Sequence, residues 1–153
     1  MPKIDKNVYA SGIRFECTGC GECCKARGGY DYVYVTLDER RRLARHLKLN
    51  TTAFTKTYCA KANGQFHLRD PQNDCLFLNG VRCTVYAARP QQCRTWPFWP
   101  ANMKRRVWEE EVKPGCPGIG VGRLHTPGEI EATLKKEQQR ERETFAQLLG
   151  LSR

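Results

Sequence analysis

Nine cysteines constrain this chain more than any other feature of its sequence. Four lie in the segment Cys17-Thr18-Gly19-Cys20-Gly21-Glu22-Cys23-Cys24, and the others are Cys59, Cys75, Cys83, Cys93 and Cys116. In a reducing compartment, thiols at this density are expected to serve as metal ligands. Disulfides are the alternative interpretation, but they need an oxidising compartment, and the odd number would leave one thiol over. The cysteines therefore predict one or two metal centres.

The spacing of the first three cysteines favours an iron–sulfur cluster over Zn²⁺. Two residues between ligands let one turn present several sulfur atoms to the same centre, and Gly19 and Gly21 supply the backbone freedom for that turn. Three such cysteines and a remote Cys-Pro pair, here Cys116-Pro117, are typical of ferredoxins that bind a [4Fe-4S] cluster. Zinc sites more often use two separate Cys-x-x-Cys pairs.

The vicinal pair Cys23-Cys24 suggests how the ligands are divided, because two adjacent sulfur atoms are poorly placed to bind one metal. We predict one site from Cys17, Cys20, Cys23 and Cys116, and a second from Cys24, Cys75, Cys83 and Cys93. A single four-thiolate site, with the other thiols in the core, is the alternative. We interpret Cys59 as a buried helix residue, because a free cysteine behaves as a small hydrophobe.

These motifs resemble those of the YkgJ-like cysteine-cluster family, a zinc- or iron-chelating domain named for the pattern CxxCxxCC. The resemblance covers about residues 14–122 and rests on residues 17–24, Asp74 to Leu78, Arg82 to Tyr86, Arg89 to Phe98, Trp108 to Val112 and Cys116 to Gly120. It implies a metal-binding domain with eight cysteine ligands: Cys17, Cys20, Cys23, Cys24, Cys75, Cys83, Cys93 and Cys116. A related domain occurs in flagellin lysine N-methylases, so a redox role or a place in a modifying enzyme is the function we expect. A structural zinc module that binds protein or nucleic acid is the alternative.

The length of 153 residues suits one domain. We predict a small α+β fold over residues 1–153, with short strands, cysteine-rich loops and packed helices over about 14–122 and a long C-terminal helix over about 127–149. No apolar run approaches the ~20 residues of a bilayer span, and the first residues lack the apolar stretch of a secretory signal. We therefore expect a cytoplasmic protein with no membrane partner.

Two capping boxes predict where helices begin. The first pairs Thr36 with Glu39, and the second pairs Thr126 with Glu129 and has Pro127 at the first helical position. The apolar side of the first helix should carry Leu37, Leu43, Ala44 and Leu47, opposite a solvated face with Arg40, Arg41, Arg42 and Arg45. The polar middle of the second helix, residues 135–143, is expected to project into solvent.

Shorter elements are expected between these helices. Asn79-Gly80, between two apolar runs, predicts a two-residue hairpin turn that places Cys75 and Cys83 on adjacent strands. Further strands are expected at 32–35 and 65–68, a short helix from Thr51 or Thr52 to Cys59, and a single helical turn within 87–93.

The formal net charge of +10 raises the question of nucleic-acid binding. Eight metal-bound thiolates and two divalent centres would lower it to about +6, and acids interleave the basic residues of the last helix. We therefore expect no tight nucleic-acid binding, and a redox or protein partner whose identity the sequence does not give. His46, His67 and His125 stand singly and are weak ligand candidates. No Ser-His-Asp or Cys-His pair is placed by a motif, so we nominate no catalytic residue.

Overall fold

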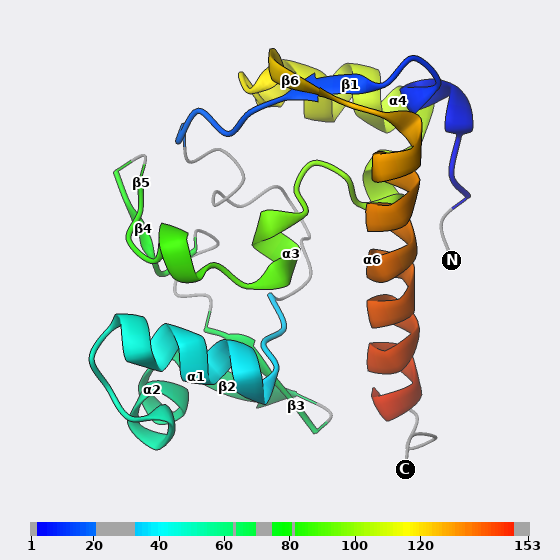
Figure 1. Ribbon diagram of the computed structural model, residues 1–153. Helices are drawn as coiled ribbons and strands as arrows, with labels where there is room; N and C mark the ends of the chain where they lie inside the picture. The colour runs from blue at the N-terminus through cyan, green and yellow to red at the C-terminus, as the bar shows by residue number, and fades with distance from the viewer. Residues whose placement is uncertain (1–2, 21–32, 63, 70–74, 81, 149–153) are drawn as a thin grey trace.

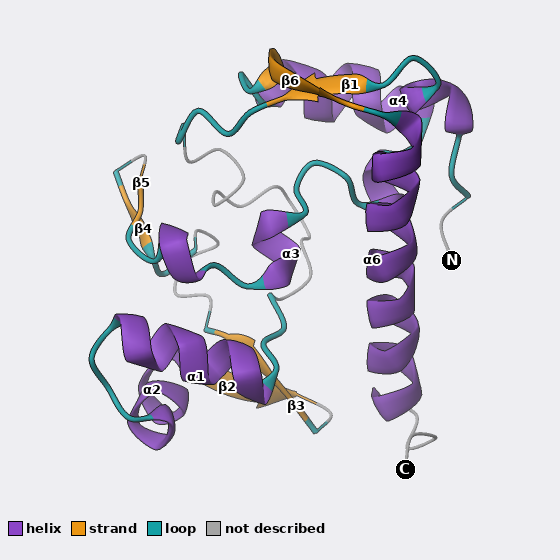
Figure 2. Ribbon diagram, viewed as in Figure 1, coloured by secondary structure: helices purple, strands orange, loops and turns teal. Residues whose placement is uncertain are grey.

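The computed structural model describes residues 3–20, 33–62, 64–69, 75–80 and 82–148 (Figure 1). In these segments, short helices alternate with short antiparallel strands that form small separate sheets, which confirms the predicted α+β class (Figure 2). The strands are β1 (Ile13–Phe15), β2 (Cys59–Ala62), β3 (Gln65–Leu68), β4 (Leu78–Asn79), β5 (Arg82–Cys83) and β6 (Ile119–His125). The longer helices are α1 (Leu37–His46), α2 (Thr51–Tyr58) and α6 (Pro127–Leu148). Shorter turns are η1 (Lys6–Tyr9), η3 (Tyr86–Ala88), α3 (Gln91–Arg94), η4 (Pro100–Asn102), α4 (Arg105–Val107), η5 (Trp108–Val112) and α5 (Lys113–Gly115).

Both predicted capping boxes are present. At the start of α1, the Glu39 N–H donates to Thr36 Oγ1 at 3.2 Å, and the Thr36 N–H donates to the Glu39 carboxylate at 2.8 Å. At the start of α6, Thr126 and Glu129 make the same reciprocal pair at 2.8 and 3.3 Å. Each pair satisfies N–H groups that the first helical turn leaves without a backbone partner. Over the described stretches of the chain, no helix combines the length and apolarity that a membrane span requires.

A ribbon of β1 and β6 pairs a strand near the N-terminus with the strand that precedes α6, a pairing that the sequence did not predict. Ile13 lies opposite His125, and Phe15 lies opposite Ile119 after a shift in register between Arg14 and Phe15. The ribbon covers a hydrophobic cluster that we call the ribbon core. Its buried members are Tyr9, Ile13, Trp96, Phe98, Met103, Trp108, Val112, Cys116, Ile130 and Leu134.

A second hydrophobic cluster, the helix-pair core, lies under α1 and α2. Its buried members are Val35, Leu43, Ala44, Phe54, Cys59, Leu68, Phe77, Val85 and Ala88. The predicted strand over 65–68 is confirmed as β3 and pairs with β2. The strand expected at 32–35 is reduced, over its described residues, to a single bridge between Tyr34 and His67.

The α6 helix runs past both cores (Figure 1), and its polar middle is solvent-exposed as expected at Lys135, Lys136, Gln139 and residues 141–143, but not at Glu137 and Arg140. Arg140 donates to the Tyr34 carbonyl at 2.6 Å and lies 3.7 Å from the buried Glu39 carboxylate. The Glu137 side chain, also buried, accepts from Gln91 Nε2 at 3.3 Å, while the Gln91 N–H donates to Glu39 at 2.9 Å. These bonds attach α6 to α1 and α3, which is why charged residues are buried there.

The apolar side of α1 also differs from the prediction. Leu43 and Ala44 are buried, but Leu37 is 45% exposed because it lies in the first turn, beyond the end of the core. Arg40 and Arg42 are half-buried rather than solvated, and Arg42 donates to the Arg89 carbonyl at 2.8 Å. The helical turn expected within 87–93 is divided at Pro90, which precedes α3 instead of lying within it.

Candidate metal centre

The structure describes seven of the nine cysteines. Cys17 is exposed, Cys20, Cys75, Cys83 and Cys93 are half-buried, and Cys59 and Cys116 are buried. Cys23 and Cys24 lie outside the described residues. The predicted division of ligands between two sites therefore stays a prediction, and the geometry bears on it through the segments that carry the other six predicted ligands.

Cys17 contacts the segment that carries Cys83 and Cys93. The Tyr86 side chain, three residues after Cys83, lies within hydrogen-bonding reach of the Cys17 thiol, and this interaction, followed by burial, raises the pKa of Tyr86 above its ordinary value. The Arg89 guanidinium lies 3.6 Å from the centre of the Tyr86 ring. In Figure 1 the chain leaving β1 accordingly reaches the side of the molecule where β4 and β5 lie. Nothing in the sequence pattern distinguishes Tyr86 from the other residues of the segment from Arg82 to Tyr86.

Cys17 also lies near the segment that carries Cys116. The Glu16 N–H donates to the Gly118 carbonyl at 3.1 Å, so the residues that follow Cys116 run beside the residue that precedes Cys17. A β-carbon on Gly118 would lie 2.1 Å from the Glu16 carbonyl oxygen, which means that only glycine permits this approach. The pairing places Cys17 and Cys116 at the same end of the β1–β6 ribbon, and their assignment to one site stays a prediction.

Cys75 and Cys83 lie at the two ends of the β4–β5 hairpin. The predicted hairpin is present, but Asn79 ends β4 and pairs with Arg82, so the turn begins at Gly80, whose φ is +64°. Cys83 lies opposite Leu78 in β5. Cys75 is not on the adjacent strand as expected, because its carbonyl accepts from the Leu78 N–H in a turn before β4. Both side chains pack against the helix-pair core.

Cys93 lies in α3. Side-chain hydrogen bonds brace the loop that connects it to Cys83. Arg94 donates to the carbonyls of Arg89 and Ala87, both at 2.9 Å, and Arg89 donates to the Tyr86 carbonyl at 2.9 Å. Trp99 donates from its indole to the Gln92 carbonyl at 3.0 Å. These bonds fix the backbone on both sides of Cys93. Trp96 and Phe98, which follow Cys93 closely in sequence, are buried in the ribbon core.

Each of the three histidines has a ring nitrogen close to a backbone carbonyl oxygen. A ring nitrogen of His46 lies 3.3 Å from the Thr84 carbonyl, one of His67 lies 2.9 Å from the Leu68 carbonyl, and one of His125 lies 3.2 Å from the Phe15 carbonyl. Within the described parts of the chain, no three Cys, His, Asp or Glu side chains come close enough together to hold a metal ion. The predicted centres both include residues of the 17–24 segment that lie outside those parts.

Cys59 differs from the other cysteines in its surroundings. It lies at the junction of α2 and β2 in the helix-pair core, with 3% of its surface exposed. Burial raises the pKa of its thiol, against the opposing effect of Arg40 and Arg69. A thiol held neutral in this way is a poor metal ligand, because ligation requires the thiolate. Cys59 is therefore buried as predicted, but it is the first residue of β2 and not a helix residue, because α2 ends at Tyr58.

The donor set fits a soft metal centre. Thiolates are the preferred ligands of zinc and of iron–sulfur clusters. Four thiolates around one centre carry net negative charge; the Tyr86 hydroxyl lies beside Cys17, and the positively charged Arg89 guanidinium lies over the Tyr86 ring. Cys17, Cys20, Cys75, Cys83 and Cys93 all keep part of their surface accessible for ligation.

Comparison with known proteins places the chain in a family. It is 32% identical over 99 residues to Uncharacterized protein MJ0661 of Methanocaldococcus jannaschii, an alignment that covers 63% of this chain and 51% of that protein. It is 25% identical over 133 residues to Uncharacterized protein MJ0939 of the same organism, covering 81% of this chain and 44% of that protein. The chain thus spans about half the length of these relatives. No solved structure matches it. Residues 16–117 match the family CxxCxxCC, described as "Putative zinc- or iron-chelating domain", and the chain belongs to this family.

Proposed function

We propose that the chain binds iron as one or two iron–sulfur clusters, of the [4Fe-4S] type, through the eight cysteines of its family pattern. The observation that carries this proposal is the position of Cys17, which lies beside Gly118 on one side and Tyr86 on the other. Three segments that are far apart in sequence and rich in cysteine therefore approach one another around the first motif. The family description, zinc- or iron-chelating, supports the general chemistry.

The choice of iron–sulfur over zinc rests on ligand spacing and on the surroundings of the sulfur atoms. Cys17-x-x-Cys20-x-x-Cys23 with Cys116-Pro117 follows the ferredoxin pattern. A bound cluster would supply one-electron chemistry, and hydrogen bonds to its sulfur ligands tune the reduction potential. The Tyr86 hydroxyl is positioned to make such a bond to Cys17. Trp96 and Phe98 are buried in the same cluster as Cys116, and an apolar shell of this kind limits access of water to a metal centre.

A structural zinc module is the second candidate. The family description names zinc, and the formal charge of +10 provides a basic surface for a partner. In that case the metal would stabilise the fold and the function would lie in the surface that the fold presents. The cysteine positions are the same for both candidates, so only the metal itself distinguishes them.

Visible absorption and elemental analysis of protein purified without oxygen test both candidates. An iron–sulfur protein is brown and contains iron and sulfide, whereas a zinc-thiolate protein is colourless. We expect Cys20→Ala and Cys83→Ala to lose metal, and Cys59→Ala, the same chemical change at a buried site outside the ligand set, to keep it. Folded protein with neither metal would overturn the proposal, and metal loss from Cys59→Ala equal to that of the other variants would overturn the ligand assignment.

A further inference from the structure

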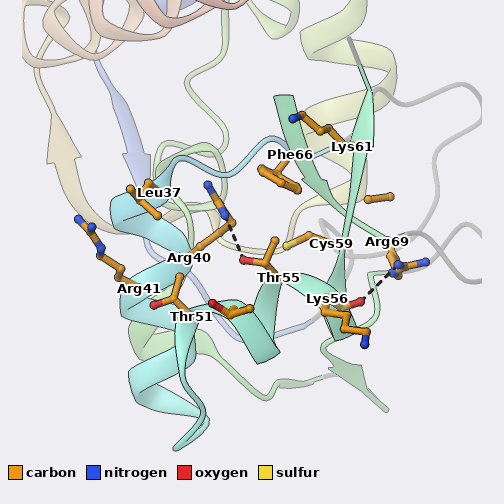
Figure 3. Close-up of a pocket in the computed structure, with 12 residues that line it drawn as sticks. Leu37, Arg40, Arg41, Thr51, Thr55, Lys56, Cys59, Lys61, Phe66 and Arg69 are labelled. Carbon is orange, nitrogen blue, oxygen red and sulfur yellow. Dashed lines mark hydrogen bonds between the residues drawn. The ribbon is translucent and has the colours of Figure 1, made fainter. Parts of the chain in front are cut away.

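A cavity of about 710 Å³ opens between α1, α2 and the β2–β3 hairpin, away from the proposed metal ligands (Figure 3). Five cationic side chains line it: Arg40, Arg41, Lys56, Lys61 and Arg69. Among the described residues in its lining there is no Asp or Glu. None of the eight proposed ligand cysteines lines it either, and the one cysteine there is Cys59. Positive charge concentrated in a concave site without acids attracts anions.

Arg40 is the innermost of these cations and has hydrogen-bonding capacity to spare. One terminal nitrogen donates to Thr55 Oγ1 at 3.0 Å, and the guanidinium lies 4.2 Å from the centre of the Phe66 ring. Its Nε is buried and has no hydrogen-bond partner among the described residues. A buried N–H without an acceptor is costly, so the protein alone does not fully satisfy the Arg40 guanidinium. Figure 3 shows Arg40, Thr55, Phe66 and Cys59 facing one another across the cavity.

The other charges differ in how far they are already neutralised. Arg41 is paired with Asp38 at 3.2 Å, which reduces what it can offer a ligand. Arg69 donates to the Lys56 carbonyl at 3.3 Å, an uncharged acceptor that does not itself neutralise the positive charge. Lys61 lies 5.4 Å from the centre of the Phe66 ring. Arg40 and Arg69 both act electrostatically on Cys59, and Figure 3 shows them on opposite sides of that residue.

The walls are suited to more than a bare ion. Thr51 and Thr52 add hydroxyl groups in the first turn of α2, while Leu37 and Phe66 provide apolar surface. A volume of this size lies within the range of pockets that hold small organic ligands, about 300–1,000 Å³. The guanidinium fork of arginine matches the oxygens of a phosphate better than a lysine ammonium does.

We propose that this cavity binds a small organic phosphate, with the phosphate held by Arg40 and Arg69 and the organic part against Phe66 and Leu37. The proposal does not depend on the metal, because the two sites share no residue. Loss of phosphate binding and loss of metal are therefore separable measurements on the same protein.

Calorimetric titration of the full-length, metal-loaded protein with phenyl phosphate tests the proposal, with inorganic phosphate as a second probe. Removing one charge-assisted hydrogen bond should weaken binding roughly 10- to 100-fold. We expect that loss for Arg40→Gln and for Arg69→Gln. Arg45→Gln is the matched control, because it removes the same charge from an exposed position on α1 that does not line the cavity. Metal content should stay unchanged in all three variants.

Three results would overturn the proposal of an organic-phosphate site. One is the lack of saturable binding of phenyl phosphate below about 10 mM. Another is equal weakening by Arg45→Gln and Arg40→Gln, which would show a diffuse surface effect. Tighter binding of a short oligothymidylate, lost in the same arginine variants, would reassign the cavity to nucleic-acid phosphates. Should Arg40→Gln fail to fold by circular dichroism, Arg69→Gln, an exposed position, decides the outcome alone.

Discussion

Replacing Gly118 with alanine should separate the segments that carry Cys17 and Cys116. The added β-carbon would lie 2.1 Å from the Glu16 carbonyl oxygen and 3.2 Å from the Phe15 ring. The Glu16 carbonyl oxygen belongs to the backbone, so it cannot rotate away as the end of a side chain can. The same stretch of chain holds the 3.1 Å hydrogen bond from the Glu16 N–H to the Gly118 carbonyl. The substitution therefore acts on the contact that brings the two cysteines together.

The size of the effect follows from the distances. To reach even 3.0 Å, the shortest separation that real β-carbons show, the two backbones must part by about 0.9 Å. That movement lengthens the Glu16–Gly118 bond beyond hydrogen-bonding range and costs about 1 kcal/mol. Overpacking adds about 1–3 kcal/mol, for a total of roughly 2–4 kcal/mol. In a chain of this size, 1 kcal/mol lowers Tm by about 2–4 °C, so a drop of roughly 5–15 °C is expected.

The assay is thermal unfolding of Gly118→Ala together with its metal content after anaerobic purification. Gly128→Ala is the control, because a β-carbon there meets nothing within 4 Å and the residue lies in the first turn of α6. We expect the control to keep both Tm and metal. A Gly118→Ala protein with wild-type Tm would refute the steric argument. A destabilised protein with full metal occupancy would refute the role of this contact in the metal centre.

Four further predictions address other contacts. Tyr86→Phe removes the hydroxyl bonded to Cys17, worth about 1 kcal/mol, so the metal should be lost to a chelator roughly fivefold faster; an unchanged rate would contradict the contact. Arg140→Gln should lower the free energy of unfolding by about 1–3 kcal/mol, because it breaks the bonds to Tyr34 and Glu39. Chemical denaturation measures this loss. An unchanged free energy of unfolding would show that α6 is held by its apolar residues alone. Burial raises the pKa of Cys59, so its contribution to stability is complete below the ordinary thiol pKa of about 8.5 and is lost as pH rises through the raised value. With rising alkaline pH, the free energy of unfolding of the wild type should therefore fall more steeply than that of Cys59→Ala. Parallel curves of unfolding free energy against pH would contradict this. Binding of the metal-loaded protein to random DNA and RNA should be weak and salt-sensitive; an affinity near 10⁻⁸ M at physiological salt, the range of specific recognition, would contradict it.

The parts of the fold that the sequence predicted are those encoded by neighbouring residues. The two capping boxes need only residues three apart, and each was found where the pattern placed it. The hairpin at Asn79-Gly80 was found for the same reason, with its turn one residue later. The β1–β6 ribbon was missed because β1 is three residues long, too short for an alternating pattern to be recognised, and its partner lies about a hundred residues away.

The polar middle of α6 shows a different limit of prediction from sequence. Its composition indicated exposure, since charged residues are rarely buried unless paired. The pairing partners, Glu39 in α1 and Gln91 in α3, are distant in sequence. A charge pattern on one helix cannot reveal that a second element supplies the complementary group. Buried ion pairs and amide contacts of this kind become predictable only when the arrangement of the helices is known.

The candidate metal centre depends both on residues that are close in sequence and on contacts between distant segments. Spacing within residues 17–24 indicates the ligand type, because a turn can present its own thiols without help from the rest of the chain. Which remote cysteine joins them depends on tertiary contacts, and Cys17 has two: Tyr86 on the Cys83 side and the Glu16–Gly118 pairing on the Cys116 side. Cys116 is fixed in the ribbon core, whereas Cys75 and Cys83 pack on the helix-pair core. A metal held from both sides would therefore join the two cores directly. Its binding energy would then stabilise their relative position and not only the cysteine loop, since ligand binding that requires the folded arrangement adds to the stability of that arrangement.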